Sequence, residues 1–161
     1  MAAVDYFLKI DGIPGESKDS NHADEIQLES WSWGETNSGS MSSGGGGGAG
    51  KVSVQDFSFT MTVNKASPEL FLACAQGKHI DSAKLTCRKA GTDQQEYFKI
   101  TFTTVLISSY QTGGSGGDII PVESITFNFE KMEYSYTPQK EDGSLDAEVV
   151  HTIDLKTMDM S

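Results

Sequence analysis

Apolar and polar residues alternate with a period of two through most of this 161-residue chain. The first such segment places four apolar residues on one side: Val4, Tyr6, Leu8 and Ile10. Successive side chains of a strand point to opposite faces, so this pattern predicts a strand with one buried face. Similar segments lie at residues 26–33, 52–63, 83–88, 98–102, 125–136 and 149–155. The chain is therefore predicted to be mainly β, with about seven strands.

The alternation slips by one residue at three places, near residues 29–30, 55–56 and 130–131. One extra residue in a strand is the signature of a β-bulge, which bends and coils the strand. Long strands with repeated bulges suit a closed sheet, so we expect a two-sheet β-barrel. The turn residues Gly91-Thr92-Asp93 predict a hairpin between two of these strands.

One segment breaks the alternation and predicts a short α-helix that covers an opening or edge of the sheet. Its start has the order of an N-cap serine, an N1 proline and an acidic first turn, in Ser67-Pro68-Glu69. Gly77 is a typical stop signal. Three residues are expected to share one face at helical spacing: Leu70, Phe71 and Cys74.

Charge and length limit the class of protein. The chain has 23 acidic and 12 basic side chains, a formal net charge of −11. This balance argues against binding to nucleic acid or to an anionic membrane surface. The length corresponds to a single domain, residues 1–161. No secretory signal and no apolar run of about 18 residues is found, so we expect synthesis in the cytoplasm without export by a cleaved signal.

Residues that carry catalysis or bind metals are sparse. Two cysteines, Cys74 and Cys87, exclude a disulfide framework or a zinc site built from cysteines, and they are expected to be buried free thiols. His22, His79 and His151 show no ligand spacing, and no nucleophile elbow is present. His151 lies on an apolar strand face, where a core or interface histidine is expected. We therefore expect no catalytic residues, no metal and no cofactor.

A glycine-rich loop occupies about residues 37–51. Its end, Gly45 to Val52, resembles a phosphate-binding P-loop, but Val52 stands where the motif needs a Ser or Thr hydroxyl. The loop also runs into a predicted strand, whereas a P-loop opens a helix. Nucleotide binding is therefore disfavoured. A loop of this length is typical of a functional or a disordered segment.

The run Trp31-Ser32-Trp33-Gly34 places both indoles on one strand face and Ser32 on the other. A small polar residue opposite an indole-rich core fits a lining surface that must not bind permanently. The alternative is a strand face that contacts only solvent.

Short motifs along the chain, from Val4 to about Lys140, resemble the haemolysin-coregulated protein (Hcp) family of type VI secretion systems. They stand in the family's order and spacing: Gly15-Glu16-Ser17, Trp31-Ser32-Trp33-Gly34, Gly50-Lys51-Val52, Val54-Gln55-Asp56-Phe57, Gly77-Lys78-His79, Lys84-Leu85-Thr86, Arg88-Lys89-Ala90-Gly91 and Thr112-Gly113-Gly114-Ser115-Gly116-Gly117.

The resemblance implies a structural protein and not an enzyme. Six copies would form a ring, and rings would stack head-to-tail into a hollow tube that a contractile sheath expels. The tube would carry a VgrG-type spike at its tip and small effector proteins in its lumen, and the type VI apparatus would secrete it. Ser32 is expected to line the lumen, with Gln27 and Glu29 as weaker candidates.

In such a tube we expect the glycine-rich loop to contact the next ring, because glycine lets backbones approach closely and a neighbouring ring would order the loop. The residues expected there are Gly39, Ser40, Met41, Gly44, Gly45, Gly46, Gly47, Gly48, Gly50 and Lys51. Two alternatives remain: a nucleotide-dependent enzyme, based on the glycine loop, and a monomeric carbohydrate-binding β module, based on exposed Trp and Tyr residues.

Overall fold

A computed structural model describes residues 4–39, 51–91 and 93–161. These residues form eleven strands and one helix. In chain order they are β1 (Val4–Ile10), β2 (Ile26–Leu28), β3 (Ser30–Ser32), β4 (Glu35–Asn37), β5 (Val52–Val54), β6 (Phe57–Thr62), α1 (Ala66–Gln76), β7 (His79–Lys89), β8 (Glu96–Gly113), β9 (Val122–Tyr136), β10 (Val149–Asp154) and β11 (Asp159–Met160).

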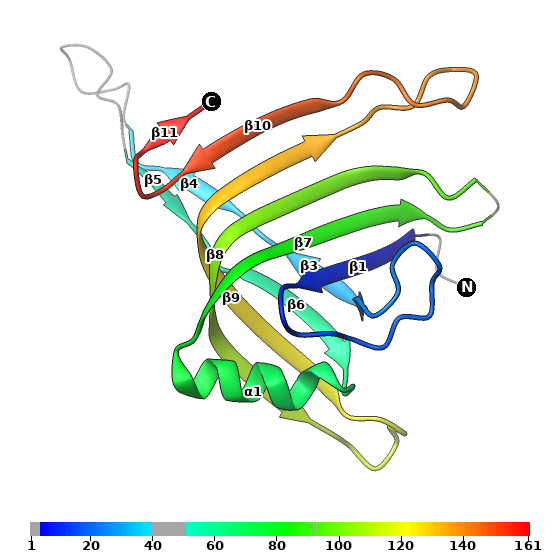
Figure 1. The fold of residues 1–161 in the computed structure, drawn as a ribbon, viewed down its shortest axis with the longest axis vertical. Coiled ribbons are helices and arrows are strands. Elements are labelled where there is room, and N and C mark those ends of the chain that lie inside the picture. Colours follow the sequence, from blue (N-terminus) through cyan, green and yellow to red (C-terminus); the bar gives the residue numbers. More distant parts are fainter. Residues whose placement is uncertain (1–3, 40–50, 92) are drawn as a thin grey trace.

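Nine of the strands form one antiparallel sheet that curves around the core (Figure 1). Its main path runs β11-β10-β9-β8-β7-β1-β2, while β6 pairs with β9 and β3 pairs with β6. The main path ends at β2, and the branch through β6 ends at β3. Only Glu29 separates β2 from β3, so the chain itself connects these two ends of the sheet. The expected mainly β fold with one helix is confirmed. The expected barrel is not fully closed, because the strand pairs stop at β2 on one side of Glu29 and at β3 on the other.

The slips in alternation mark real breaks. Two of them divide predicted strands, into β2 and β3 and into β5 and β6. Together with the short β4 and β11, which were not predicted, these divisions raise the expected seven strands to eleven. The third slip is not a bulge in β9. It marks a change of neighbouring strand. Residues 122–127 of β9 pair with β6, and residues 131–136 pair with β10.

The core is rich in phenylalanine. The largest fully buried side chains are Phe7, Phe57, Phe59, Phe102, Phe127, Leu8, Ile26, Met61, Leu70, Leu85, Ile100 and Ile125. Phe57 is central, since its ring contacts Phe102 and Phe127 at 5.0 Å between centroids and stacks with Trp31 at 6.0 Å. Both indoles of the Trp-Ser-Trp run are half-buried rather than buried, because they lie at the border of this core.

Helix α1 starts at Ala66, one residue before the predicted N-cap. Asn64 takes the capping role, because its Oδ1 accepts a hydrogen bond from the Ala66 amide at 2.8 Å. Ser67 and Pro68 therefore lie inside the first turn, and the predicted N-cap and N1 assignments are wrong. The stop at Gly77 is confirmed: its φ of +60° is a conformation that glycine adopts without strain.

The buried face of α1 differs from the predicted one. Leu70 is buried, Cys74 is half-buried and Phe71 is exposed. The Ser67 hydroxyl is also buried, and it donates a hydrogen bond to the buried carboxylate of Glu123. This contact fixes the start of the helix to the sheet. Phe71 is 59% exposed, and one edge of its ring contacts Tyr110 of β8 at 6.2 Å between centroids.

The two cysteines differ in exposure: Cys87 is buried and Cys74 is half-buried, so the prediction holds fully only for Cys87. Burial raises the pKa of the Cys87 thiol to about 12. Only thiolates react with alkylating reagents, so we expect iodoacetamide at pH 8 to modify Cys74 at least ~100-fold faster than Cys87. Peptide mapping of the labelled protein measures both rates. Similar rates at the two positions would contradict the buried environment of Cys87.

Candidate functional site

A face of serine and threonine side chains covers β3, β6 and β9 on the side away from the core. The strand register places these residues in two rows across the three strands. The first row is Ser30, Thr60 and Ser124, and the second is Ser32, Ser58 and Thr126. We call these six residues the hydroxyl face. All are exposed or half-buried.

Several hydroxyls of this face are already hydrogen-bonded. Ser30 Oγ lies 2.6 Å from Thr60 Oγ1. Thr126 Oγ1 lies 2.6 Å from Ser109 Oγ and 2.7 Å from Ser108 Oγ on β8. A molecule that contacts this face would gain little by replacing these bonds with its own, because such exchanges are nearly neutral in free energy. The face therefore suits transient contact.

The three residues predicted to line a lumen are all exposed: Ser32, Gln27 and Glu29. Glu29 lies between β2 and β3, and its amide donates to the Thr60 carbonyl oxygen at 2.9 Å. Because Glu29 is an extra residue, both it and Ser30 point away from the core. Ser32 belongs to the hydroxyl face, and Gln27 and Glu29 continue its exposed side along the same segment.

The ends of the glycine-rich loop are held by the β4–β5 hairpin, in which Asn37 pairs with Val52. Of the residues predicted to contact a neighbouring ring, Gly39 and Lys51 are described and exposed. The others lie outside the described residues: Ser40, Met41, Gly44, Gly45, Gly46, Gly47, Gly48 and Gly50. The chain enters strand β5 directly after Lys51, so the helix that a P-loop requires does not follow it.

Residues 131–136 of β9, with β10 and β11, form an extension that we call the wing. In Figure 1 the wing reaches away from α1 toward the opposite end of the molecule. On its core side, the register aligns Tyr134 with the buried Ile100 and Tyr136 with Val149. These wing residues are nevertheless 45, 47 and 54% exposed for Tyr134, Tyr136 and Val149. The apolar core side of the sheet thus continues past the core.

A second apolar surface lies at the helix end of the molecule, which comprises α1 and the β8–β9 turn (Figure 1). Phe71 and Leu72 of α1 are 59 and 46% exposed, and Ile119 of the turn is fully exposed. Large apolar side chains exposed at one end of a molecule make that end a candidate interaction surface. The molecule therefore carries two different apolar surfaces at opposite ends.

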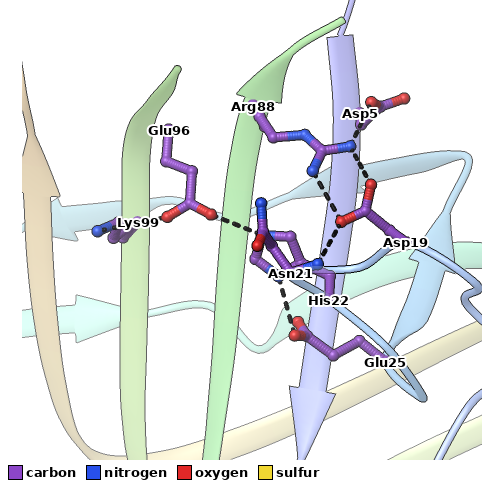
Figure 2. Close-up of polar contacts among 8 residues, drawn as sticks. All are labelled: Asp5, Asp19, Asn21, His22, Glu25, Arg88, Glu96 and Lys99. Carbon is purple, nitrogen blue, oxygen red and sulfur yellow. Dashed lines mark hydrogen bonds and ion pairs between the residues drawn. The ribbon is translucent and has the colours of Figure 1, made fainter. Parts of the chain in front are cut away.

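A buried arginine is the main feature that the alternation missed. Arg88 lies on the face of β7 that was predicted to be polar and exposed, but it is 3% exposed. Its guanidinium donates to Asp19 at 2.8 and 2.9 Å and to Asp5 at 3.1 Å, as Figure 2 shows. The segment between β1 and β2 covers this face. The sequence of β7 alone therefore could not predict that Arg88 is buried.

His22, from the same covering segment, is buried between two carboxylates (Figure 2). Its Nδ1 lies 2.8 Å from Glu25 and its Nε2 lies 2.6 Å from Glu96 on β8. His22 also stacks on Phe7 at 4.4 Å. This cluster fixes the covering segment to three strands and has the character of a structural anchor.

The ion pair between Asp19 and Arg88 predicts a dependence of stability on pH. The hydrogen bond to Arg88 lowers the pKa of Asp19 from 3.8 to about 2. A lowered pKa contributes stability that is present above pH 3.8 and is lost as the pH falls toward 2. We expect Asp19→Asn to lower the free energy of unfolding by about 2 kcal/mol at pH 7.

Urea unfolding of the unmodified protein and the Asp19→Asn variant at pH 7, 4 and 2.5 measures this effect. The difference between the two proteins should be largest at pH 7 and shrink at pH 2.5. An equal difference at all three pH values would contradict the assigned ion pair.

Within the described ranges, no group of three or more His, Cys, Asp or Glu side chains is placed to hold a metal ion. In the same residues no helix combines the length and apolar character needed to cross a membrane.

Comparison with known proteins identifies the family. The family model described as "Type VI secretion system effector, Hcp" matches residues 7–136. Protein hcp1 of Pseudomonas aeruginosa strain PAO1 is 57% identical over 145 residues, which cover 89% of this chain and 90% of that protein.

Solved structures agree with this match. A type six secretion system protein has a TM-score of 0.92 at 30% identity, covering 99% of this chain and 100% of that chain. Hcp1 from Salmonella typhimurium has a TM-score of 0.83 at 37% identity, with the same coverage. The chain belongs to the Hcp family of type VI secretion system proteins.

Proposed function

We infer that this chain is the subunit of a secretion tube. Six copies associate head-to-tail into a ring, and rings stack head-to-tail into a hollow tube. The observation that carries the proposal is the pair of different apolar surfaces, on the wing and at the helix end. Two different surfaces that meet make a heterologous contact, which generates a closed ring or an open filament. A self-complementary dimer would need only one surface.

The wing supports this proposal in a second way. An antiparallel sheet commonly has one face on the core and one face in water. On the wing the core-side face is apolar and exposed, so a neighbouring subunit would extend the core over it. This contact would bury Tyr134, Tyr136 and Val149 at once.

The hydroxyl face would line the lumen, with Ser32 in the lining and Gln27 and Glu29 beside it. Its short hydroxyls, many already hydrogen-bonded, suit small effector proteins that must be carried and then released. The glycine-rich loop would contact the next ring. A VgrG-type spike would sit at the tip, and a contractile sheath would expel the tube after synthesis of its subunits in the cytoplasm. In this proposal the chain acts as a carrier and not as an enzyme.

Ser32→Gln tests the lumen assignment. The substitution places six longer amide side chains in the lining of each ring, so retention and export of effectors should fall at least ~10-fold while the ring persists. Ser82→Gln is a matched control, because Ser82 is also exposed but lies on β7, outside the hydroxyl face. Effector export is measured by immunoblotting of secreted fractions. Equal export by both variants would contradict the lumen assignment.

A further inference from the structure

A pocket of about 340 Å³ opens between the wing and the segment after β3. It is lined by Trp33, Glu35, Met132, Tyr134, His151 and Ile153. Its volume lies at the low end of the 300–1,000 Å³ range of ligand pockets, which leaves space for a side chain or two. Most of its lining is aromatic or aliphatic. His151, expected as a core or interface residue, is exposed at this pocket.

Trp33 and Tyr134 give the pocket two aromatic walls. The indole Nε1 of Trp33 has no hydrogen-bond partner among the described residues, but it is buried, so an occupant of the open pocket does not reach it. The pocket therefore favours an apolar side chain that packs against the rings.

The C-terminal half of α1 presents such a side chain. Phe71 is 59% exposed and is held on a rigid helix, so its burial costs little conformational entropy.

Charge agrees with this assignment. Glu35 lies on the rim of the pocket, whereas Lys78 follows the C-terminal end of α1, and both are exposed. Ile119 is the competing apolar candidate at the helix end, but it lies in a turn and lacks an aromatic ring. Stacked or edge-on contacts with Trp33 and Tyr134 favour an aromatic occupant. Helix α1 and the wing lie at opposite ends of the molecule, so the helix cannot fill its own pocket (Figure 1).

We propose that Phe71 of one subunit inserts into the Trp33–Tyr134 pocket of the next subunit in the ring. The contact places the C-terminal half of α1 across the wing, with Lys78 toward Glu35. This inference rests on the proposed ring and names the side chains that join its subunits.

Cross-linking of a cysteine pair tests the contact while leaving Phe71 and the apolar lining intact. Ala75 is exposed one helical turn after Phe71, and Glu35 lies at the pocket. The variant carries Ala75→Cys and Glu35→Cys in a Cys74→Ser background; the remaining Cys87 is buried and unreactive. A short bismaleimide should produce a ladder of covalent oligomers up to six subunits on denaturing gels. Each single-cysteine variant should remain monomeric on the same gels.

Two further variants make the test specific. Adding Phe71→Ser to the pair should reduce the cross-linked fraction at least ten-fold. Replacing Glu35→Cys with Val150→Cys, on the opposite face of β10 from His151, should give no ladder.

The outcomes separate this contact from the ring itself. If the unmodified protein has the mass of six subunits but the pair gives no ladder, the contact is wrong and the ring stands. A ladder that Phe71→Ser leaves unchanged also overturns the role of Phe71. Dimers from a single-cysteine variant would indicate a self-complementary contact and overturn the head-to-tail arrangement. A monomeric unmodified protein would overturn the ring and the contact together.

Discussion

Phe57→Ala should lower the free energy of unfolding by about 3–5 kcal/mol, the largest effect that a single core substitution is expected to have here. Phe57 is fully buried, and its ring contacts Trp31, Phe59, Phe102 and Phe127. Removal of the ring leaves a cavity where β3, β6, β8 and β9 meet, and rigid neighbours fill such a cavity only in part.

Urea unfolding followed by tryptophan fluorescence measures this loss. Phe71→Ala is the matched control, because the same atoms are removed from a largely exposed position whose ring contacts that of Tyr110; below the concentration at which subunits associate, it should cost about 1 kcal/mol or less. Equal losses for the two variants would show that Phe57 is not the centre of the core.

Shortening the glycine-rich loop should abolish secretion and leave the ring intact. The pairing of Asn37 with Val52 places the loop ends on adjacent strands, so residues 39–50 can be replaced by an Asn-Gly turn without disturbing β4 and β5. Ordering a glycine-rich loop costs about 1 kcal/mol or more of backbone entropy per residue, which contact with a neighbouring ring would offset.

Secreted protein in culture supernatants should fall below one tenth of the unmodified level, while light scattering should report the same mass for both proteins. A control variant that replaces residues 39–50 with an equally long Gly-Ser segment separates loop length from loop sequence. Loss of the ring on shortening would place the loop within the ring and contradict its role in stacking.

The sequence predicted the strands well because each strand's alternation reflects its own burial. Phe57 to Thr62 in β6 follow this rule, whereas in β1 Phe7 is also buried on the opposite face. The alternation also predicted that Ser32 faces away from the core, and the resemblance to the Hcp family correctly indicated the fold.

Burial that depends on distant segments could not be predicted in this way. Arg88 and Thr86 lie on a polar strand face, yet both are buried because the segment between β1 and β2 covers them. Close approach within that segment requires Gly15, where a Cβ would lie 2.5 Å from the Glu25 carbonyl oxygen. The sequence shows that a glycine is present. It does not show that this glycine lets the segment pack over β7.

The exposed apolar ends were missed for the opposite reason. Phe71, Tyr134 and Tyr136 fit the apolar periodicity of their elements, so they were expected on the core side. Periodicity indicates which face of an element is apolar, but it does not indicate whether the same chain covers that face. On the wing and on α1 the chain leaves the apolar face exposed, and we propose that another subunit covers it.

The mass of the purified protein in solution tests the central proposal most directly. The account predicts a particle of six times the 17.4 kDa subunit mass by multi-angle light scattering at micromolar concentration in physiological salt. The particle should fall to lower mass when Tyr134→Ser and Phe71→Ser are combined. A single species of 17.4 kDa across the concentration range would contradict the ring and, with it, the proposed tube.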